Sequence, residues 1–278
     1  MPQLSTFHSQ LSAFPAALPY NSELSLWLSV DPLSDKYPGS SPYVYCANNP
    51  VRLVDVDGRE IFVMVGDKKC EYRGGQLYFG NETIIPEEYS FAEYVFGALQ
   101  IMSSSRIGRT VIEALMDDSY SYIIKSKSDG VNIFSPAEGK RGGDVLLRSS
   151  SYKDVILRSL SHELFHGYQY LNGQGGKNIH NEVEAYMFED IICSSLDRNY
   201  RSELMSRILS GATEPYKQAF EDFKHWDCSS VTAEKFDKVF TALTNGFETP
   251  AKANSSGIYN GIAKGNAASH LLRDILCQ

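Results

Sequence analysis

The sequence predicts an α+β protein with short strands in its first half and helices mainly in its second half. Residues 59–80 alternate between apolar and polar side chains around the glycine pair Gly74-Gly75, a pattern typical of strands joined by tight turns. From residue 151 onward, apolar residues recur with helical spacing. Hydrophobic residues make up 42% of the 278 positions, which is enough to bury a core.

The composition changes near Gly58, and this change predicts two parts. Residues 1–58 are rich in Pro, Ser, Tyr and Asn and contain few helical signals, so we expect a small β-rich segment there. Residues 59–278 carry most of the periodic apolar pattern and are expected to form the main domain. At the junction, residues 51–56 and 59–65 are expected to be strands joined by an Asp57-Gly58 turn.

The remaining elements are expected in a definite order along the main domain. A hairpin should turn at Gly74-Gly75. The expected helices and strands are helices 90–102 and 109–118, strands 119–126 and 144–149, a long helix between Ser151 and Asn172, and a helix over 181–196, with later breaks at 211–215 and 254–257.

Several classes of function are disfavoured by composition. The net charge of -8 argues against binding to nucleic acid. No apolar run reaches the roughly 18 residues of a membrane span, and the N-terminus lacks the basic and apolar regions of a signal peptide. The five cysteines are scattered without a CxxC pair, so we expect neither a disulfide framework nor a thiolate zinc site.

The long helix carries the sequence His-Glu-Leu-Phe-His at residues 162–166. A capping box at Ser151 and Asp154 begins it, and Asn172-Gly173 ends it. Residues four apart on a helix lie about 6 Å from one another, so His162 and His166 can bind one ion at about 2.0–2.1 Å each. Glu163 can act as general base toward metal-bound water. The spacing therefore predicts a catalytic Zn²⁺ site.

A catalytic zinc needs a third protein ligand. The residues after His166 lack the third histidine of the metzincins, and the next carboxylates are Glu182 and Glu184. On a helical wheel Glu184 shares the apolar arc that should face inward, whereas Glu182 shares a polar arc with Glu189. We therefore expect Glu184 to be the third ligand, with Glu182 as the less favoured alternative.

An HExxH motif followed by a glutamate on the next helix resembles the gluzincins, such as the thermolysin-like peptidases. The Glu-Ala-x-x-Phe pattern from Glu184 is also similar to that of small bacterial zincins. The resemblance covers residues 162–196 only. It implies a zincin-like metallopeptidase fold for the main domain.

The residue that stabilises the transition state stays unknown at this point. Histidines and tyrosines near the motif have the right chemistry, and none is preferred over the others. These candidates are His180, His225, His270, Tyr168, Tyr170 and Tyr186.

Residues 20–58 carry a second set of ordered motifs. They are Trp27-Leu-Ser-Val-Asp31-Pro32, Tyr43-Val-Tyr45, Asn48-Asn49-Pro50 and Asp55-x-Asp57-Gly58. This segment resembles the C-terminal end of the RHS-repeat-associated core. In that family the core precedes a variable toxin domain and releases it by aspartate-dependent self-cleavage. Asp31 and Asp55 occupy the matching positions, although Val56 replaces the usual proline after Asp55.

Together the two resemblances imply the toxin end of an RHS-type polymorphic toxin. Its activity would be zinc-dependent cleavage of a protein in a target cell, and an immunity protein would neutralise it at home. It would reside in the bacterial cytoplasm and then be secreted or delivered by a route that needs no signal peptide. The alternatives are a nuclease toxin and a catalytically inactive zincin-fold binding module, which the intact Glu163 disfavours.

Overall fold

The chain divides into two compact units, Met1–Gly58 and Arg59–Gln278. A computed structural model describes residues 20–21, 26–27, 60–116, 120–137, 142–149, 153–194, 231–253, 262–264 and 270–277. In the first unit, β1 (Tyr20–Asn21) pairs antiparallel with β2 (Leu26–Trp27). The expected self-cleavage positions Asp31 and Asp55 lie outside the described residues, as do the expected strand at 51–56 and its Asp57-Gly58 turn.

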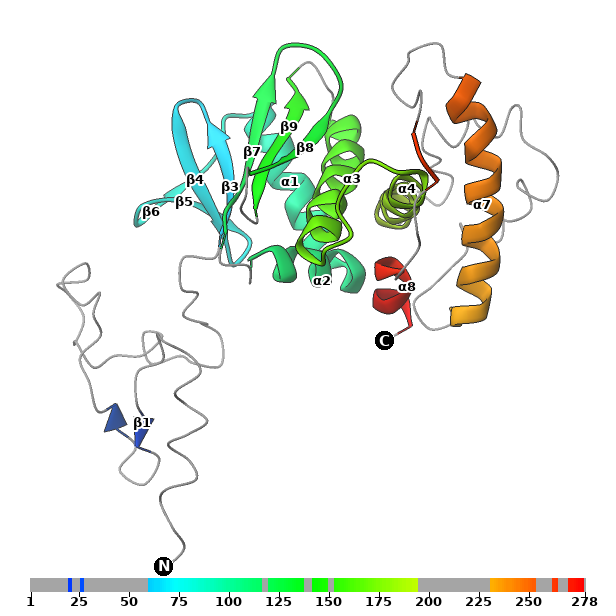
Figure 1. The fold of residues 1–278 in the computed structure, drawn as a ribbon. Coiled ribbons are helices and arrows are strands. Elements are labelled where there is room, and N and C mark those ends of the chain that lie inside the picture. The colour runs from blue at the N-terminus through cyan, green and yellow to red at the C-terminus, as the bar shows by residue number, and fades with distance from the viewer. Residues whose placement is uncertain are drawn as a thin grey trace, which may run out of the picture. The chain divides into compact units, whose positions relative to one another are not determined.

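The second unit is built on a mixed sheet with the strand order β6-β5-β4-β3-β7-β9-β8 (Figure 1). Its strands are β3 (Ile61–Val65), β4 (Lys68–Arg73), β5 (Gln76–Phe79), β6 (Glu82–Ile84), β7 (Tyr122–Lys127), β8 (Ile133–Pro136) and β9 (Gly143–Arg148). Strands β3 to β6 form an antiparallel meander, and β7 runs parallel to both β3 and β9. Strand β8 returns antiparallel to β9 at one end of the sheet.

The hairpin expected at Gly74-Gly75 is confirmed, because Arg73 pairs with Gln76 across that turn. Both glycines have positive φ, at 56° and 77°. Two-residue turns with positive φ at both positions match the twist of the strands they join, and glycine reaches this conformation at no steric cost.

Six helices occur in the described part of the chain, and with the mixed sheet they confirm an α+β fold. Their bounds are α1 (Phe91–Ser104), α2 (Arg106–Met116), α3 (Lys153–Leu171), α4 (Ile179–Ser194), α7 (Ala233–Ala253) and α8 (Leu271–Leu276). Each of the first four overlaps a helix expected from the sequence. The Ser90 side chain caps α1 by accepting a hydrogen bond from the Glu93 amide.

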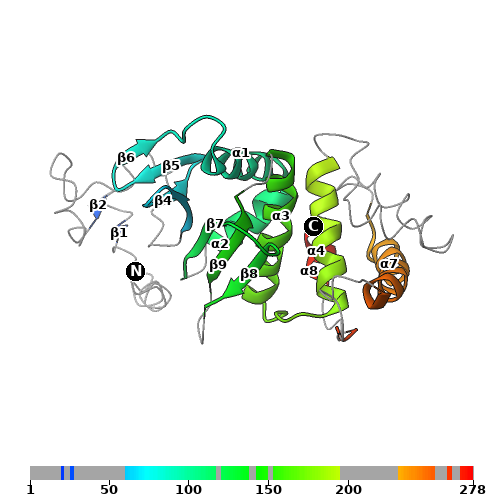
Figure 2. The ribbon, with the colours of Figure 1, turned by 90° about the horizontal axis from the view of Figure 1, so that it is seen from above.

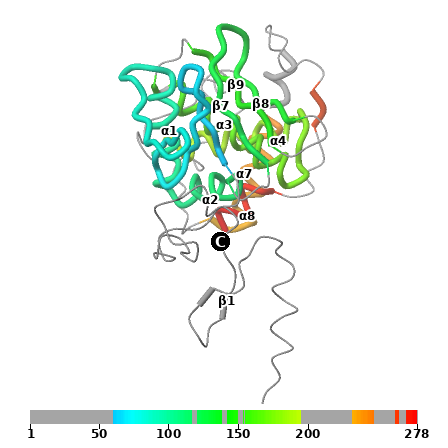
Figure 3. The backbone as a smooth tube through the Cα atoms, turned by 90° about the vertical axis from the view of Figure 1, so that its left-hand side faces the viewer, coloured from blue at the N-terminus to red at the C-terminus, as the bar shows by residue number. Residues whose placement is uncertain are grey.

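The helices lie in successive layers beside the sheet. Helix α1 packs on β3, and α3 packs on β8 and β9; α4 lies beside α3, with α7 beyond it (Figure 2). In the view of Figure 3, β7, β9 and β8 lie in front of α3 and α4, and α1 lies beside the strands. The core between sheet and helices includes Ile61, Val63, Tyr122, Ile124, Val145, Leu147, Leu99, Val111, Leu160 and Leu164, all fully buried. Helices α3 and α4 are thus interior helices.

His270, at the N-terminus of α8, packs between aromatic side chains of α7. Its ring centroid lies 4.5 Å from that of Phe240 and 5.6 Å from that of Phe236. Its Nδ1 atom is buried without a hydrogen-bond partner. Burial and the neighbouring Arg273 lower the pKa of His270, and they outweigh Asp237, whose Oδ1 lies 4.0 Å from Nε2.

We predict that acidification destabilises this region and that His270→Phe relieves part of the effect. The unfolded chain takes up a proton near the ordinary histidine pKa of 6.5, whereas the folded chain does so only at lower pH. The stability that comes from neutral His270 is therefore present above pH 6.5 and is lost as the pH falls through the lowered pKa. Urea unfolding midpoints at several pH values would check this; identical pH dependence in both proteins would contradict it.

Candidate metal centre

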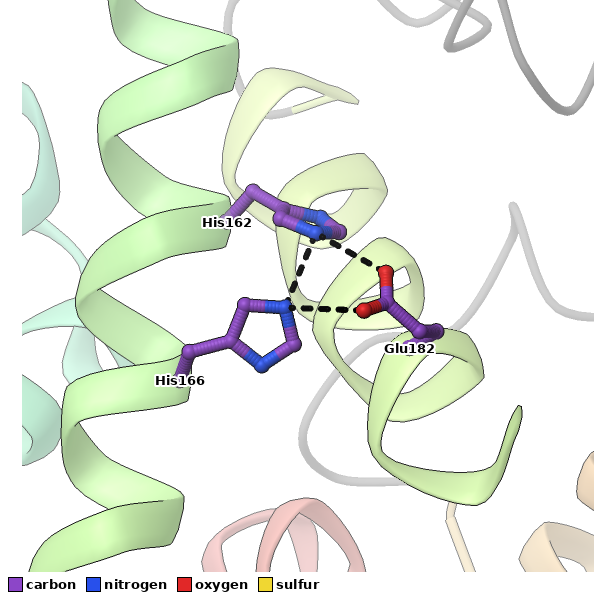
Figure 4. A group of neighbouring side chains, drawn as sticks. All are labelled: His162, His166 and Glu182. Atoms are coloured by element: carbon purple, nitrogen blue, oxygen red, sulfur yellow. Dashed lines mark hydrogen bonds and ion pairs between the residues drawn. The ribbon is translucent and has the colours of Figure 1, made fainter. Parts of the chain in front are cut away.

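His162 and His166 lie one turn apart on α3, and their rings face α4 (Figure 4). Their Nε2 atoms are 3.1 Å apart. Glu182, in the first turn of α4, directs its carboxylate at both rings: Oε2 lies 3.6 Å from His162 Nε2 and Oε1 lies 3.7 Å from His166 Nε2. Within the described residues this is the one cluster of three such side chains whose donor atoms lie within 4.8 Å of one another. It is a possible metal-binding triad.

The spacing of these donor atoms fits a tetrahedral ion. Ligand atoms at about 2.0–2.1 Å from such an ion stand about 3.3 Å from each other. The 3.1 Å separation of the nitrogens and the 3.6 and 3.7 Å separations to the carboxylate oxygens bracket this value. Two imidazoles and one carboxylate suit divalent transition metals, and three protein ligands leave one position for water or substrate.

The structure favours Glu182 over Glu184 as the third ligand, which is the reverse of the expectation from the sequence. Glu182, the less favoured alternative, lies beside the histidines, whereas Glu184 points away from them. One oxygen of Glu184 accepts a hydrogen bond from the Leu272 amide at 2.8 Å, and the other accepts from the side chains of Gln169 and Gln174.

The helical wheel ranked the two glutamates wrongly because twelve of the sixteen residues of α4 are buried. The polar arc of Glu182, Glu189 and Asp190 is only 9%, 6% and 5% exposed, so it is not a solvated outer surface of the protein. Helix α4 is covered by α3 and α7, and the segment carrying Leu272 reaches Glu184. Amphipathic patterns distinguish core from solvent, and they carry no information when both faces are covered.

Two side chains that were not predicted as site residues from the sequence lie beside the Nδ1 atoms of the histidines. Gln169 Oε1 lies 2.8 Å from His166 Nδ1, and Glu189 Oε2 makes an ion-pair contact at 3.4 Å with His162 Nδ1, without good hydrogen-bond geometry. A polar partner stands beside Nδ1 of each ring, and both Nε2 atoms face the common point. Helical spacing could have found them, since Gln169 is three residues after His166 and Glu189 is seven after Glu182.

Glu163 lies beside the triad and is held by the edge of the sheet. Its Oε2 accepts a hydrogen bond of 2.7 Å from the backbone N–H of Phe134, in strand β8. Strand β8 was not predicted, although a Ser-Asp-Gly turn precedes it and a proline ends it.

The electrostatics of the cluster reflect carboxylates and imidazoles that share a buried site. Burial alone lowers the pKa of His162, but the carboxylates of Glu182, Glu189 and Glu163 outweigh it and raise the pKa to about 10. Burial raises the pKa of Glu163. Burial also acts to raise the pKa of Glu182, but the two histidines reverse this and lower it. Such a cluster favours positive charge, which protons or a bound cation can supply.

A cleft of about 600 Å³ exposes the cluster to solvent. Strand β8, helix α3, helix α4 and the turn between the two helices line it. Of the six candidates for transition-state stabilisation, Tyr170 and Tyr186 line the cleft, and the ring of Tyr186 lies 4.2 Å from that of His162. The other described candidates, Tyr168, His180 and His270, are not part of its lining, and His225 lies outside the described residues.

No family model matches the chain, and neither does any curated protein or solved structure. The zincin-like fold and the RHS resemblance therefore stay predictions. In the part of the chain that the structure describes, no helix combines the length and apolar character needed to cross a membrane.

We predict that Glu182→Ala abolishes measurable binding of a divalent metal, with Zn²⁺ as the probe, because one of three ligands is lost. Glu189→Gln should weaken binding by about 10- to 100-fold, since it perturbs only the support of His162. Competition with a chromogenic chelator measures both, and circular dichroism checks the fold. If folded Glu182→Ala binds Zn²⁺ like the wild type, the triad is misassigned.

Proposed function

We propose that this protein is a zinc-dependent endopeptidase in which His162, His166 and Glu182 hold Zn²⁺ and Glu163 is the general base. The observation that carries the proposal is the position of Glu163: its carboxylate lines the same cleft as the three converging donors, and Phe134 N–H fixes one of its oxygens at 2.7 Å. A fixed carboxylate beside an open metal site is the arrangement that hydrolysis by activated water requires.

When bound, the zinc ion supplies a Lewis acid that polarises water and the peptide carbonyl. Glu163 carries out the proton transfers. Because Oε2 accepts from Phe134, Oε1 is the oxygen that can take a proton from the attacking water. The same carboxyl group can then deliver this proton to the amine that leaves as the peptide bond breaks. Glu189 and Gln169 hold the two imidazoles in orientation throughout.

Strand β8 supports a peptide as the substrate. Among the described residues it has a paired neighbour, β9, on one side only. The Phe134 N–H bonds to Glu163 and not to β9, so the outer edge of the strand faces the cleft. An extended peptide can add to such an edge through backbone groups other than the Phe134 N–H, with its side chains entering neighbouring pockets. Half-exposed Val131 and Ile133, which line the cleft beside this edge, offer apolar contacts.

The biological setting that we propose is the toxin end of an RHS-type polymorphic toxin. The resemblance of residues 20–58 to the end of an RHS core supports this, since the candidate protease site follows in the next part of the chain. A protein of the target cell would be the substrate and an immunity protein the natural inhibitor. The three convergent donors beside Glu163 favour hydrolysis over a binding module, and the net charge of -8 disfavours a nuclease.

We predict that Glu163→Gln retains Zn²⁺ but loses about 10²- to 10⁴-fold in peptidase activity, because the amide cannot accept the proton from water. Hydrolysis of a quenched fluorescent peptide library measures activity, and elemental analysis measures bound zinc. Toxicity on expression in the cytoplasm of a bacterial host should fall in parallel.

The control is Glu182→Ala, which should lose zinc and activity together. A Glu163→Gln protein that holds zinc and is as toxic as the wild type would show that peptide hydrolysis is not the cause of toxicity. A wild-type protein that binds no zinc when it is supplied would refute the proposal as a whole.

A further inference from the structure

We propose that Glu184 is a positioning residue for the metal centre: it fixes the orientation of the Gln169 side-chain amide, and Gln169 in turn fixes which ring nitrogen of His166 carries the proton. The importance of this for zinc binding rests on the function proposed above. The relay itself is a property of the metal-free protein and can be tested separately.

Glu184 is completely buried, and its carboxylate accepts three hydrogen bonds. Oε1 accepts from the backbone N–H of Leu272 at 2.8 Å, just inside helix α8. Oε2 accepts from Gln169 Nε2 at 3.2 Å and from Gln174 Nε2 at 3.1 Å. The two oxygens of the carboxyl group can together accept all three hydrogen bonds.

The chemistry around Gln169 determines how its amide is turned. The end of the amide that meets Glu184 Oε2 also meets the backbone oxygen of Asn181, at 3.0 Å. The Asn181 carbonyl oxygen can only accept hydrogen bonds, so this end must be the NH₂ group. The carbonyl end, Oε1, therefore lies 2.8 Å from Nδ1 of His166.

The turned amide selects one tautomer of His166. Because Gln169 Oε1 only accepts, His166 Nδ1 must carry the proton. The lone pair then lies on Nε2, which is the nitrogen that points at His162 and Glu182. The opposite tautomer would turn an N–H bond toward the ion and could not ligate it.

A glutamine at position 184 cannot satisfy the same neighbours, although it has nearly the same shape. If its oxygen accepts from Leu272 N–H, its NH₂ group meets the NH₂ groups of Gln169 and Gln174. Turning the Gln169 amide relieves that conflict, loses the bond to the Asn181 carbonyl and presents a donor to His166 Nδ1. We therefore expect Glu184→Gln to populate the tautomer with the proton on Nε2.

The test is ¹⁵N-resolved NMR of the histidine rings in the metal-free protein, followed by zinc titration against a chromogenic chelator. In the wild type, His166 should show a protonated Nδ1 and an unprotonated Nε2. In Glu184→Gln both tautomers should appear, and the dissociation constant for Zn²⁺ should rise by about 10- to 100-fold. The matched control is Gln174→Ala, which removes another donor to the same oxygen and should leave both measurements unchanged.

A rescue separates positioning from simple loss of stability. In the double variant Glu184→Gln/Gln169→Glu, the carboxylate stands at position 169. There it accepts hydrogen bonds from His166 Nδ1 and from the side-chain amide at position 184. It loses the bond to the Asn181 carbonyl, so it should be less stable, but it should recover the single tautomer and part of the lost affinity. If Glu184→Gln alone does not fold, the tautomer of His166 in the double variant still tests the proposal.

A folded Glu184→Gln protein with a single Nδ1-protonated His166 and wild-type zinc affinity would overturn the proposal. So would a double variant in which His166 still shows both tautomers. A wild-type chain that binds no zinc would refute the proposed function instead, and the tautomers of the metal-free protein would still test the relay.

Discussion

The packing of α3 against α4 is the constraint on which the rest of the second unit depends. It buries the imidazole of His162 and half-buries that of His166 against three carboxylates, those of Glu163, Glu182 and Glu189. Removing charged groups from water is costly unless each is paired, so the interface is stable only where the partners are fixed in register. The sheet supplies one fixed partner through Phe134, and α3 supplies another through Gln169. The surrounding layers keep this polar interior closed on all but the cleft side.

Local patterns were sufficient to predict the features that depend on neighbouring residues in the chain. The histidine pair follows from helical spacing, and the hairpin at Gly74-Gly75 follows from the backbone freedom of glycine. The α+β class follows from the change in periodicity along the chain. Each of these features is decided within about one or two turns of helix or one strand pair, so no knowledge of distant contacts is needed.

The features that escaped prediction depend on contacts between distant segments. Strand β8 is four residues long, and its importance comes from a bond to Glu163 that spans 29 positions. The choice between Glu182 and Glu184 depends on which helix covers each side of α4. Both sides are buried, so hydrophobicity could not rank them. Each glutamate has its own buried partners, because Glu182 faces the histidines whereas Glu184 joins α4 to Gln169 and to α8.

The contact between Glu184 and Leu272 also has a consequence for the order in which the protein folds. It joins residues 88 positions apart, and closing so long a loop is slower than forming the hairpin or the helices. We expect His162 and His166 to become neighbours early, when α3 forms, and the support of His166 to be completed only when α8 docks. A chain that is still incompletely folded would then hold metal weakly, and full affinity would arise only at the end of folding.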